Sequence, residues 1–301
     1  MKKKIYITGG TGFLGKRLTS ALKEKGYEVN IFTRRPNEAK GEADNYIGYP
    51  ETLVGLAAEV EGAHGIINLA GAGVVDRRWT DERKKLLYES RIDITSRLSE
   101  AIGKCENPSN VFLSSSGSGY YGARASEKLT EKSSAGSDFL AKLCVDWEEA
   151  AFRAKDDRTK VFCMRTGIVL DKEEGALPKI AMPFRFHVGG HLGNGHQFYP
   201  WVHIDDVVGL YVYYLECDAT SGSVNLTAPN PLPMKELCKE IARARGTKSW
   251  LHAPDFAIKL VLGEAAMVVL EGQNAIPEKA IRDGYEFKFA TAAEALQDIY
   301  S

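Results

Sequence analysis

Residues 3–15 have the sequence KKIYITGGTGFLG, and this stretch decides the fold. Its apolar run Ile5–Ile7 is β-branched and aromatic, so it predicts a buried strand. Apolar residues then recur at helical spacing from Leu14 to Leu22, which predicts a helix. Between the two elements lie three glycines at three-residue spacing, Gly9, Gly12 and Gly15. A strand, a glycine turn and a helix in this order are typical of a dinucleotide-binding site.

Each glycine has its own expected role. Gly9 allows a tight turn out of the strand, Gly12 lets the backbone approach a pyrophosphate, and Gly15 lets the helix pack closely on the strand. The helix N-terminus then presents free N–H groups and a positive dipole end to the phosphates. The spacing Gly-x-x-Gly-x-x-Gly differs from the more familiar Gly-x-Gly-x-x-Gly, and a purely structural glycine turn is the alternative.

The second predicted strand, Tyr27–Phe32, indicates which dinucleotide binds. An NAD site has an acidic residue about twenty positions past the glycines, where it holds the ribose 2′-hydroxyl. Here the strand is followed by Arg34 and Arg35 instead. Two guanidinium groups can pair with a 2′-phosphate, so the sequence predicts NADP(H) as the cofactor. The alternative is that both arginines are solvated loop residues.

The composition excludes several classes of protein. The 301 residues have a net charge of −1, so no basic field points to nucleic acid or an anionic membrane. No secretory signal is evident, and no apolar run approaches the roughly 18 residues of a membrane span. The five cysteines are dispersed without metal-ligand spacing, which is typical of reduced thiols. We therefore expect a cytoplasmic protein that binds a small-molecule substrate and no metal.

Strand and helix patterns alternate through about residue 170, which predicts an α/β fold with a doubly wound parallel sheet. Residues 1–170 are expected to form an NADP-binding Rossmann domain, to which 201–222 return. Residues 171–200 and 223–301 are expected to form a smaller, mainly helical lobe on the substrate side. The later elements predicted for the first domain are strands near Asn45–Tyr49, Gly65–Ala72, Val111–Leu113 and Lys160–Leu170, and a long helix over Thr80–Gly103.

Together these motifs resemble the short-chain dehydrogenase/reductase superfamily in its extended, nucleotide-sugar-epimerase-like form. The matching segments are the glycine turn, Asn68–Gly71, Tyr121–Gly122 and Val202–Asp206. The chain is also similar to an atypical branch of that superfamily, whose members are called epimerase family proteins. The segments shared with the branch include Gly119–Gly122, Asp138–Ala141, Asp146–Glu148 and Arg165–Leu170. The tail of the chain resembles that branch's C-terminal domain of unknown function.

The resemblance implies which residues contact the cofactor. Most of them lie in the glycine turn and after the second, fourth and fifth strands, where the carboxyl ends of parallel strands meet, and Arg165 lies in the strand predicted over Lys160–Leu170. The expected cofactor-binding residues are Gly9, Thr11, Gly12, Phe13, Leu14, Arg34, Arg35, Leu69, Ala70, Gly71, Ser114 and Arg165.

The proton-transfer residues of the superfamily are incomplete here. Active members use a serine and a Tyr-x-x-x-Lys pair, in which the lysine lowers the tyrosine pKa so that the phenol can move a proton. Lys142 matches the lysine, but Asp138 occupies the tyrosine position. A carboxyl group titrates about six pKa units below a phenol, so Asp138 is ionised at pH 7 and cannot donate the proton. The usual dyad is therefore absent.

Two replacements for the dyad are open. Tyr120 or Tyr121 could supply a phenol beside Ser116, or His203 or Asp205 could move the proton from the substrate side. In the alternative without a catalytic role, the tyrosines pack under the cofactor and His203 is a structural histidine. The catalytic candidates are Ser116, Tyr121 and Lys142, and the substrate-binding candidates are Tyr120, Arg185, Trp201 and His203.

Two functions follow as hypotheses. The first is an NADP-dependent oxidoreductase or epimerase acting on a small polar substrate, which Arg185 could clamp if the substrate is anionic. The second is a non-catalytic protein in which NADP(H) occupancy is sensed by a partner, because the fold hosts both kinds of protein. A homodimer that pairs through the long helix Thr80–Gly103 is a further expectation.

Overall fold

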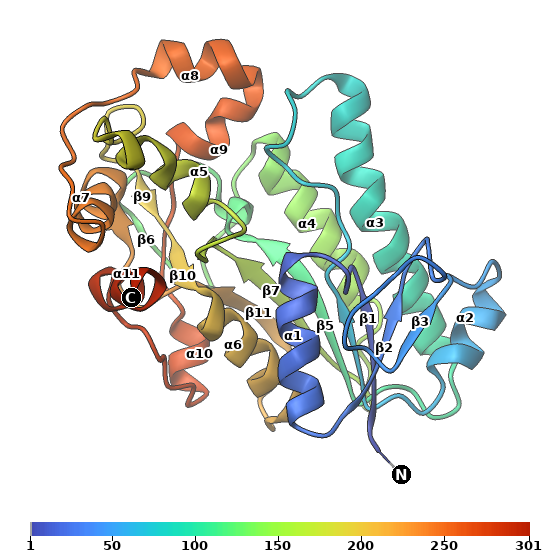
Figure 1. The fold of residues 1–301 in the computed structure, drawn as a ribbon. Coiled ribbons are helices and arrows are strands. Elements are labelled where there is room, and N and C mark those ends of the chain that lie inside the picture. The colour runs from blue at the N-terminus through green and yellow to red at the C-terminus, as the bar shows by residue number, and fades with distance from the viewer. Residues whose placement is uncertain (1) are drawn as a thin grey trace.

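The computed structural model describes residues 2–301, and its centre is a seven-stranded parallel sheet. The strand order is β11-β7-β5-β4-β1-β2-β3, in which the chain starts in the middle and winds outward in both directions (Figure 1). This confirms the predicted doubly wound sheet. The strands are β1 (Lys4–Thr8), β2 (Glu28–Phe32), β3 (Asn45–Ile47), β4 (Gly65–Asn68), β5 (Val111–Gly117), β7 (Lys160–Thr166) and β11 (Gly222–Leu226).

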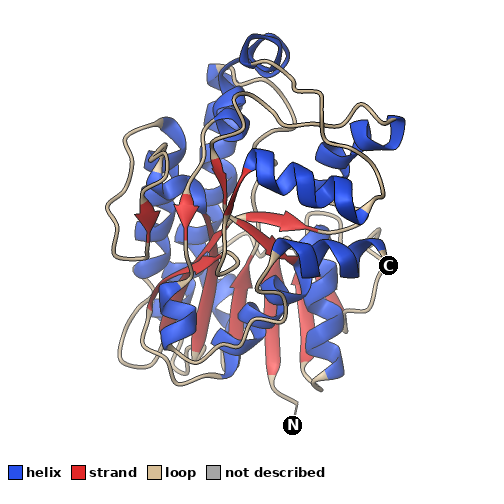
Figure 2. Ribbon diagram, turned by 90° about the vertical axis from the view of Figure 1, so that its left-hand side faces the viewer, coloured by secondary structure: helices blue, strands red, loops and turns tan. Residues whose placement is uncertain are grey.

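Helices cover both faces of the sheet. Successive side chains of a strand point to opposite faces, and because apolar side chains occur on both faces, each face is buried under helices. Ile5 and Ile7 pack in one core with α1 (Phe13–Glu24) and α6 (Ile204–Glu216). Tyr6 lies between them in the sequence and packs in a second core on the other face. Figure 2 shows the sheet between these helical layers. The helices of the second face are α2 (Leu53–Val60), α3 (Asp81–Lys104) and α4 (Phe139–Phe152).

The remaining elements form a region that lies mostly beyond the carboxyl ends of the sheet strands, although its helix at residues 278–282 packs beside β11 (Figure 1). Three short strand pairs belong to this region: β8 (Ile168–Leu170) with β10 (Trp201–His203), β9 (Phe198–Tyr199) with β12 (Leu232–Pro233), and β6 (Lys128–Leu129) with β13 (Asn274–Ala275). Its helical elements are η1 (Ser118–Tyr121), α5 (Leu177–Ala181), η2 (Met182–Phe186), α7 (Met234–Ala244), α8 (Asp255–Leu262), η3 (Gly263–Ala266), α9 (Met267–Leu270), α10 (Glu278–Arg282) and α11 (Ala292–Tyr300).

This region has its own apolar core, in which Trp201 and Phe184 pack with α7 and α11. The last sheet strand, β11, runs to Leu226, a few residues past the segment 201–222 that we expected to return to the sheet. The division into two domains stays a prediction. Among residues 2–301, no helix is both long enough and apolar enough to cross a membrane.

Candidate functional site

The glycine turn has the geometry that the sequence predicts for a phosphate-binding turn. Gly9 has a φ of +67°, in the left-handed region that favours glycine. A Cβ on Gly9 would lie 2.8 Å from the carbonyl carbon and oxygen of Leu69, so the turn touches the chain after β4. A Cβ on Gly15 would lie 2.4 Å from Cα of Gly10. The third glycine therefore lets α1 pack against the turn itself, whereas we expected packing against the strand.

The N-terminus of α1 is open to an anion. Its capping residue is Gly12, which has no side chain to accept the first N–H groups, and the first turn has no acidic residue. By contrast, the side chains of Thr52, Thr80 and Asp138 cap α2, α3 and α4. Free N–H groups and the positive end of the helix dipole make such a terminus suited to phosphate.

Arg34 and Arg35 follow β2 at the same edge of the sheet. Thr8 pairs with Phe32, so the residues after these two positions leave the sheet side by side. Both arginines are exposed, and Arg35 Nη1 lies 3.3 Å from Glu38 Oε2. An exposed ion pair of this kind is weak, so it leaves the guanidinium available to a phosphate.

Asn68 fixes the ends of three neighbouring strands relative to one another. Its Oδ1 accepts a hydrogen bond from Thr8 Oγ1 at 2.6 Å, and its Nδ2 donates to Thr95 Oγ1 at 2.7 Å and to Ser114 Oγ at 3.4 Å. Ser114, expected to contact the cofactor, is fully buried in this cluster. The structure therefore places it beneath the sheet edge. The segment Leu69–Gly71, also expected to contact the cofactor, follows Asn68 and is only partly buried or exposed.

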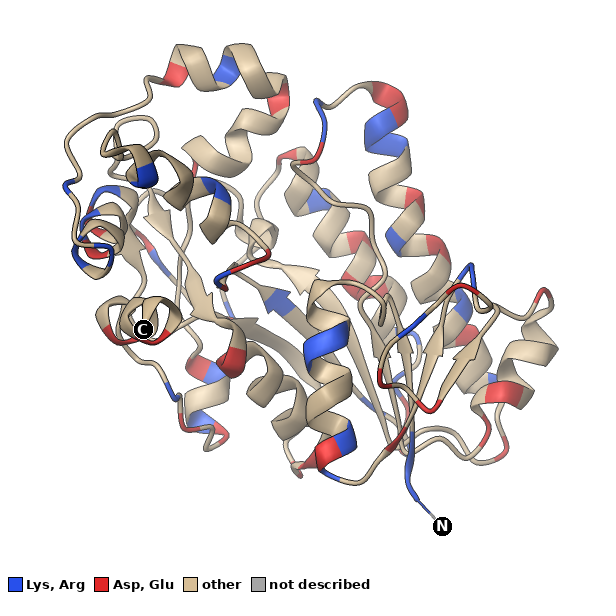
Figure 3. Ribbon diagram, viewed as in Figure 1, with Lys and Arg blue, Asp and Glu red and all other residues tan. Residues whose placement is uncertain are grey.

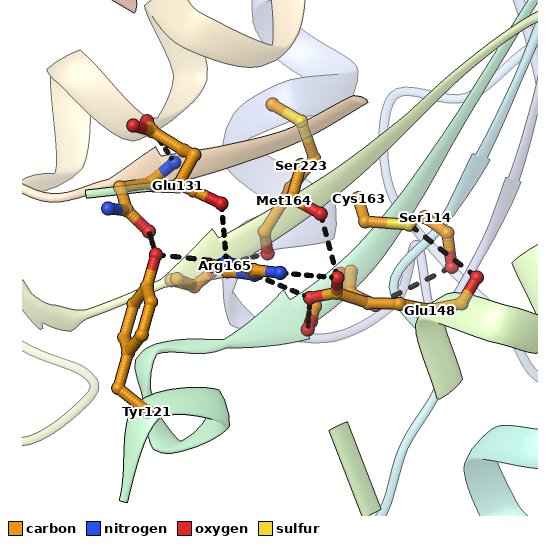
Figure 4. A network of polar contacts seen from close by, with 12 residues as sticks. Ser114, Tyr121, Glu131, Glu148, Cys163, Met164, Arg165 and Ser223 are labelled. Carbon is orange, nitrogen blue, oxygen red and sulfur yellow. Dashed lines mark hydrogen bonds and ion pairs between the residues drawn. The ribbon is translucent and has the colours of Figure 1, made fainter. Parts of the chain in front are cut away.

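Glu148 and Arg165 form a buried ion pair between α4 and β7 (Figure 4). Arg165 Nε donates to Glu148 Oε1 at 2.7 Å and Nη2 donates to Oε2 at 2.8 Å. The hydroxyls of Ser116 and Ser223 each donate to Glu148 at 2.7 Å. Arg165 is 3% exposed, so the structure places this expected cofactor contact inside the protein.

Tyr121 belongs to the same interior network. Its hydroxyl donates to Asn225 Oδ1 at 2.7 Å and accepts a hydrogen bond from Arg165 Nη1 at 3.0 Å. The side chain is fully buried, and burial raises the pKa of Tyr121 to about 12. The Arg165 guanidinium also lies 3.4 Å from the ring centroid of Tyr120. Neither the Ser116 nor the Tyr121 hydroxyl is free for a substrate in this arrangement.

Lys142 lies apart from this network. It is exposed on α4, one helical turn after Asp138. Asp138 Oδ1 accepts a hydrogen bond from Ala141 N at 3.0 Å, so the residue in the tyrosine position caps the helix. The structure thus brings Ser116 and Tyr121 into one hydrogen-bond network through Glu148 and Arg165, and Lys142 is not part of this network.

The sequence analysis gave no role to Ser118 or Gln273. Ser118 Oγ donates to Gln273 Oε1 at 3.4 Å, and this contact joins the serine-rich strand end to the C-terminal region. Ser118 belongs to the serine run after Leu113, which was its only signal in the sequence. Gln273 lies in the tail that resembles the branch's C-terminal domain, but no signal linked it to Ser118, which lies 155 residues away in the sequence.

The expected substrate-binding residues are dispersed. Trp201 is fully buried, and its Nε1 donates to the carbonyl of Asn230 at 3.0 Å. His203 is 2% exposed and caps α6 by accepting a hydrogen bond from Asp205 N at 3.1 Å. Both therefore have structural partners, whereas Arg185 is exposed on η2.

Burial is the largest influence on His203 and lowers the pKa of its imidazole. The carboxylates of Asp205, Asp298 and Asp206 raise that pKa, and Lys288 lowers it. Nε2 lies 3.4 Å from Asp298 Oδ2, yet it makes no hydrogen bond of good geometry. The folded protein therefore holds His203 neutral at a pH where the unfolded chain is already protonated.

Replacement of His203 by Asn is expected to flatten the dependence of stability on pH. As the pH falls from 7.5 through the unfolded value near 6.5, the unfolded chain gains a proton that the folded chain does not, so the wild type loses stability. One proton contributes at most about 1.4 kcal/mol per pH unit. The side-chain oxygen of Asn can replace Nδ1 of His203 as the acceptor that caps α6. Urea unfolding between pH 7.5 and 5.5 measures the slope, with the exposed His196→Asn as control. Equal slopes for wild type and His203→Asn would contradict the assignment.

Residues 2–301 contain no group of three or more His, Cys, Asp or Glu side chains that could hold a metal ion.

The strand order, the glycine turn and the open terminus of α1 define a Rossmann protein of the extended dehydrogenase type, and the chain belongs to the NAD dependent epimerase/dehydratase family, whose model matches residues 5–226. A second model, a domain of unknown function called DUF1731, matches residues 253–299. These matches confirm the resemblance that the motifs predict.

Similar proteins come from plants, bacteria and animals. The chain is 36% identical to the Epimerase family protein SDR39U1 homolog, chloroplastic, of Arabidopsis thaliana, over 98% of this chain and 86% of the relative. It is 34% identical to Epimerase family protein YfhF of Bacillus subtilis, over 98% and 97%. The crystal structure of human epimerase family protein SDR39U1 (isoform 2) with NADPH has a TM-score of 0.90, with 32% identity over 99% of both chains.

Proposed function

We propose that this chain binds NADP(H) at the carboxyl edge of its sheet. The observation that supports this best is the combination of the Gly9 turn with the uncapped terminus of α1 and the adjacent Arg34 and Arg35. The turn and the terminus would hold the pyrophosphate, and the arginines would hold the 2′-phosphate. The similar human protein was crystallised with NADPH, which agrees with a phosphorylated cofactor. When bound, the cofactor would supply hydride chemistry.

Removal of both arginines tests the proposal. The double variant Arg34→Ala, Arg35→Ala is expected to bind NADPH about 100-fold more weakly, since two charge-assisted contacts to phosphate are lost. Its affinity for NADH is expected to stay within about twofold of wild type, because NADH has no 2′-phosphate. Calorimetric titration of both nucleotides gives the two values.

A matched control is Lys40→Ala, which removes a positive charge from the same exposed loop. This variant should bind NADPH as the wild type does. Equal affinity of the wild type for NADPH and NADH would show that the arginines do not read the phosphate. If the wild type bound neither NADPH nor NADH, the proposed cofactor would be rejected altogether.

For the chemistry, we propose an oxidoreductase or epimerase acting on a small polar substrate. Membership of the epimerase/dehydratase family and the exposed Lys142, at the position of the superfamily lysine, support this. Catalytic roles for Ser116 and Tyr121 would require their hydroxyls to leave the partners described above. The pairing of two copies through α3 belongs to the same proposal.

A second candidate function is a non-catalytic NADP(H)-responsive protein. The observation that favours it is that Tyr121, the tyrosine among the catalytic candidates, has no free hydroxyl. Asp138 caps α4 in the tyrosine position, and Tyr121 is buried with its hydroxyl bonded to Asn225 and Arg165. NADPH-dependent reduction of a carbonyl compound by the purified protein would exclude this second function.

A further inference from the structure

A cationic pocket of about 260 Å³ lies between η2 and the ends of α7 and α11. Its polar lining consists of Lys172, Arg185, Arg245 and Tyr300, and apolar residues of α5 and η2 complete the wall. No carboxylate is part of this lining, and no residue of the glycine turn is either. Figure 3 shows basic residues, in blue, on η2 and around α7 on the left of the molecule.

The cations of this pocket have no protein counter-ion. Within residues 2–301, no carboxylate lies within 4.0 Å of Lys172, Arg185 or Arg245, although other basic residues of α7 are paired. Arg243, for example, lies 2.6 Å from Glu240. Three positive charges that face one small space without a partner repel one another, so an anion there would stabilise the arrangement.

Arg245 shows the missing partner most directly. Its Nε is buried and makes no hydrogen bond within residues 2–301. The guanidinium carbon lies 4.9 Å from the ring centroid of Tyr300, so α11 orients the group by contact with its face. A buried donor without an acceptor costs about 1–3 kcal/mol, which favours a ligand that supplies one.

We propose that this pocket binds a phosphate-sized dianion, such as the phosphoryl group of a small molecule. The volume lies below the roughly 300–1,000 Å³ of sites for drug-sized ligands, so a small group fits. Arginine side chains match the oxygens of phosphate with paired N–H donors, and a tyrosine hydroxyl can donate as well. The proposal does not depend on NADP(H) binding, because the pocket shares no residue with the proposed cofactor site.

The pocket brings together residues that sequence analysis did not associate. Arg185 is the residue expected to clamp an anionic substrate, and here it lies with Lys172, Arg245 and Tyr300. Lys172 directly follows Asp171, whose Oδ2 accepts a hydrogen bond from Arg17 Nη2 of α1 at 3.0 Å. The loop of Lys172 is thus attached to the helix whose N-terminus forms the proposed pyrophosphate site.

Calorimetric titration of inorganic phosphate at pH 8 and constant ionic strength tests this proposal. Wild type is expected to bind phosphate saturably, and Arg185→Gln with Arg245→Gln is expected to bind it at least about tenfold more weakly. The matched control is Lys179→Gln with Arg243→Gln, which removes two positive charges from neighbouring positions outside the pocket and should leave the affinity unchanged.

The first variant removes the contact between Arg245 and Tyr300, so a loss of folding would also abolish binding. A second variant keeps this contact. Lys172→Gln with Arg185→Gln changes only exposed side chains and should weaken phosphate binding to a similar extent. Wild-type affinity in both pocket variants would overturn the proposal, and so would an equal loss in the control. A loss confined to the two pocket variants would support it.

Discussion

Glu148→Gln is expected to lower the free energy of unfolding by about 3–5 kcal/mol. The substitution keeps the shape of the side chain but leaves Arg165 charged and buried without a counter-ion. Burial alone would lower the pKa of Arg165, but the hydrogen bonds and charge of Glu148 outweigh it and raise that pKa. Because an arginine side chain stays protonated at pH 7, the variant cannot relieve the loss by deprotonating Arg165. Ser116 and Ser223 also lose a charged acceptor.

Urea unfolding at pH 7 measures this effect. The control is Glu149→Gln on the neighbouring exposed position, which should change stability by less than about 0.5 kcal/mol. Addition of Arg165→Met to Glu148→Gln removes the unpaired charge and should recover part of the loss. A stability of Glu148→Gln equal to that of Glu149→Gln would mean that the buried pair contributes nothing to the fold.

Gly9→Ala is expected to weaken NADPH binding at least tenfold and to destabilise the protein. Alanine at this position meets two penalties, a left-handed backbone and a Cβ only 2.8 Å from the Leu69 carbonyl group. The turn must move to relieve the contact, which would cost the phosphate one or more charge-assisted hydrogen bonds. The overpacking alone should cost about 1–3 kcal/mol of stability.

Gly62→Ala separates the two penalties. Gly62 has the same φ of +67°, but a Cβ there would have nothing within 4 Å. This control should lose only the roughly 1–2 kcal/mol of the backbone term and keep its NADPH affinity. NADPH titration and urea unfolding of both variants provide the comparison. If Gly9→Ala and Gly62→Ala behave alike, close approach at the turn is not required for cofactor binding.

The order of the elements could be predicted because its signals are local. Thr80 caps α3 as its sequence indicates, by accepting a hydrogen bond from Arg83 N at 3.2 Å. The single strand predicted over Lys160–Leu170 is in fact two, β7 and β8, because the chain leaves the sheet at Gly167. A Cβ on Gly167 would lie 1.9 Å from the carbonyl oxygen of Pro200. That neighbour is far along the chain, so no local pattern revealed the break.

The site was harder to predict than the fold for the same reason. The sequence placed hydroxyl groups at the end of β5, which is where they lie. It could not show that Ser116 faces Glu148, 32 positions later, or that the Tyr121 hydroxyl meets Asn225, 104 positions later. The only signals in the sequence were an acidic residue, Glu148, and an arginine, Arg165, within an otherwise apolar strand. Only the three-dimensional structure shows that these two residues pair.

The contacts between β6 and β13 have a consequence for how the chain is made. Asn274 and Ala275 pair with Lys128 and Leu129, so a segment synthesised near the end completes a structure begun in the first half. The apolar residues of α11 likewise fill a core that already contains Phe184 and Trp201. Until these late segments are synthesised, part of the interior of the nascent chain therefore stays uncovered. The segment that the family domain matches, residues 253–299, therefore supplies side chains to a core that earlier parts of the chain begin.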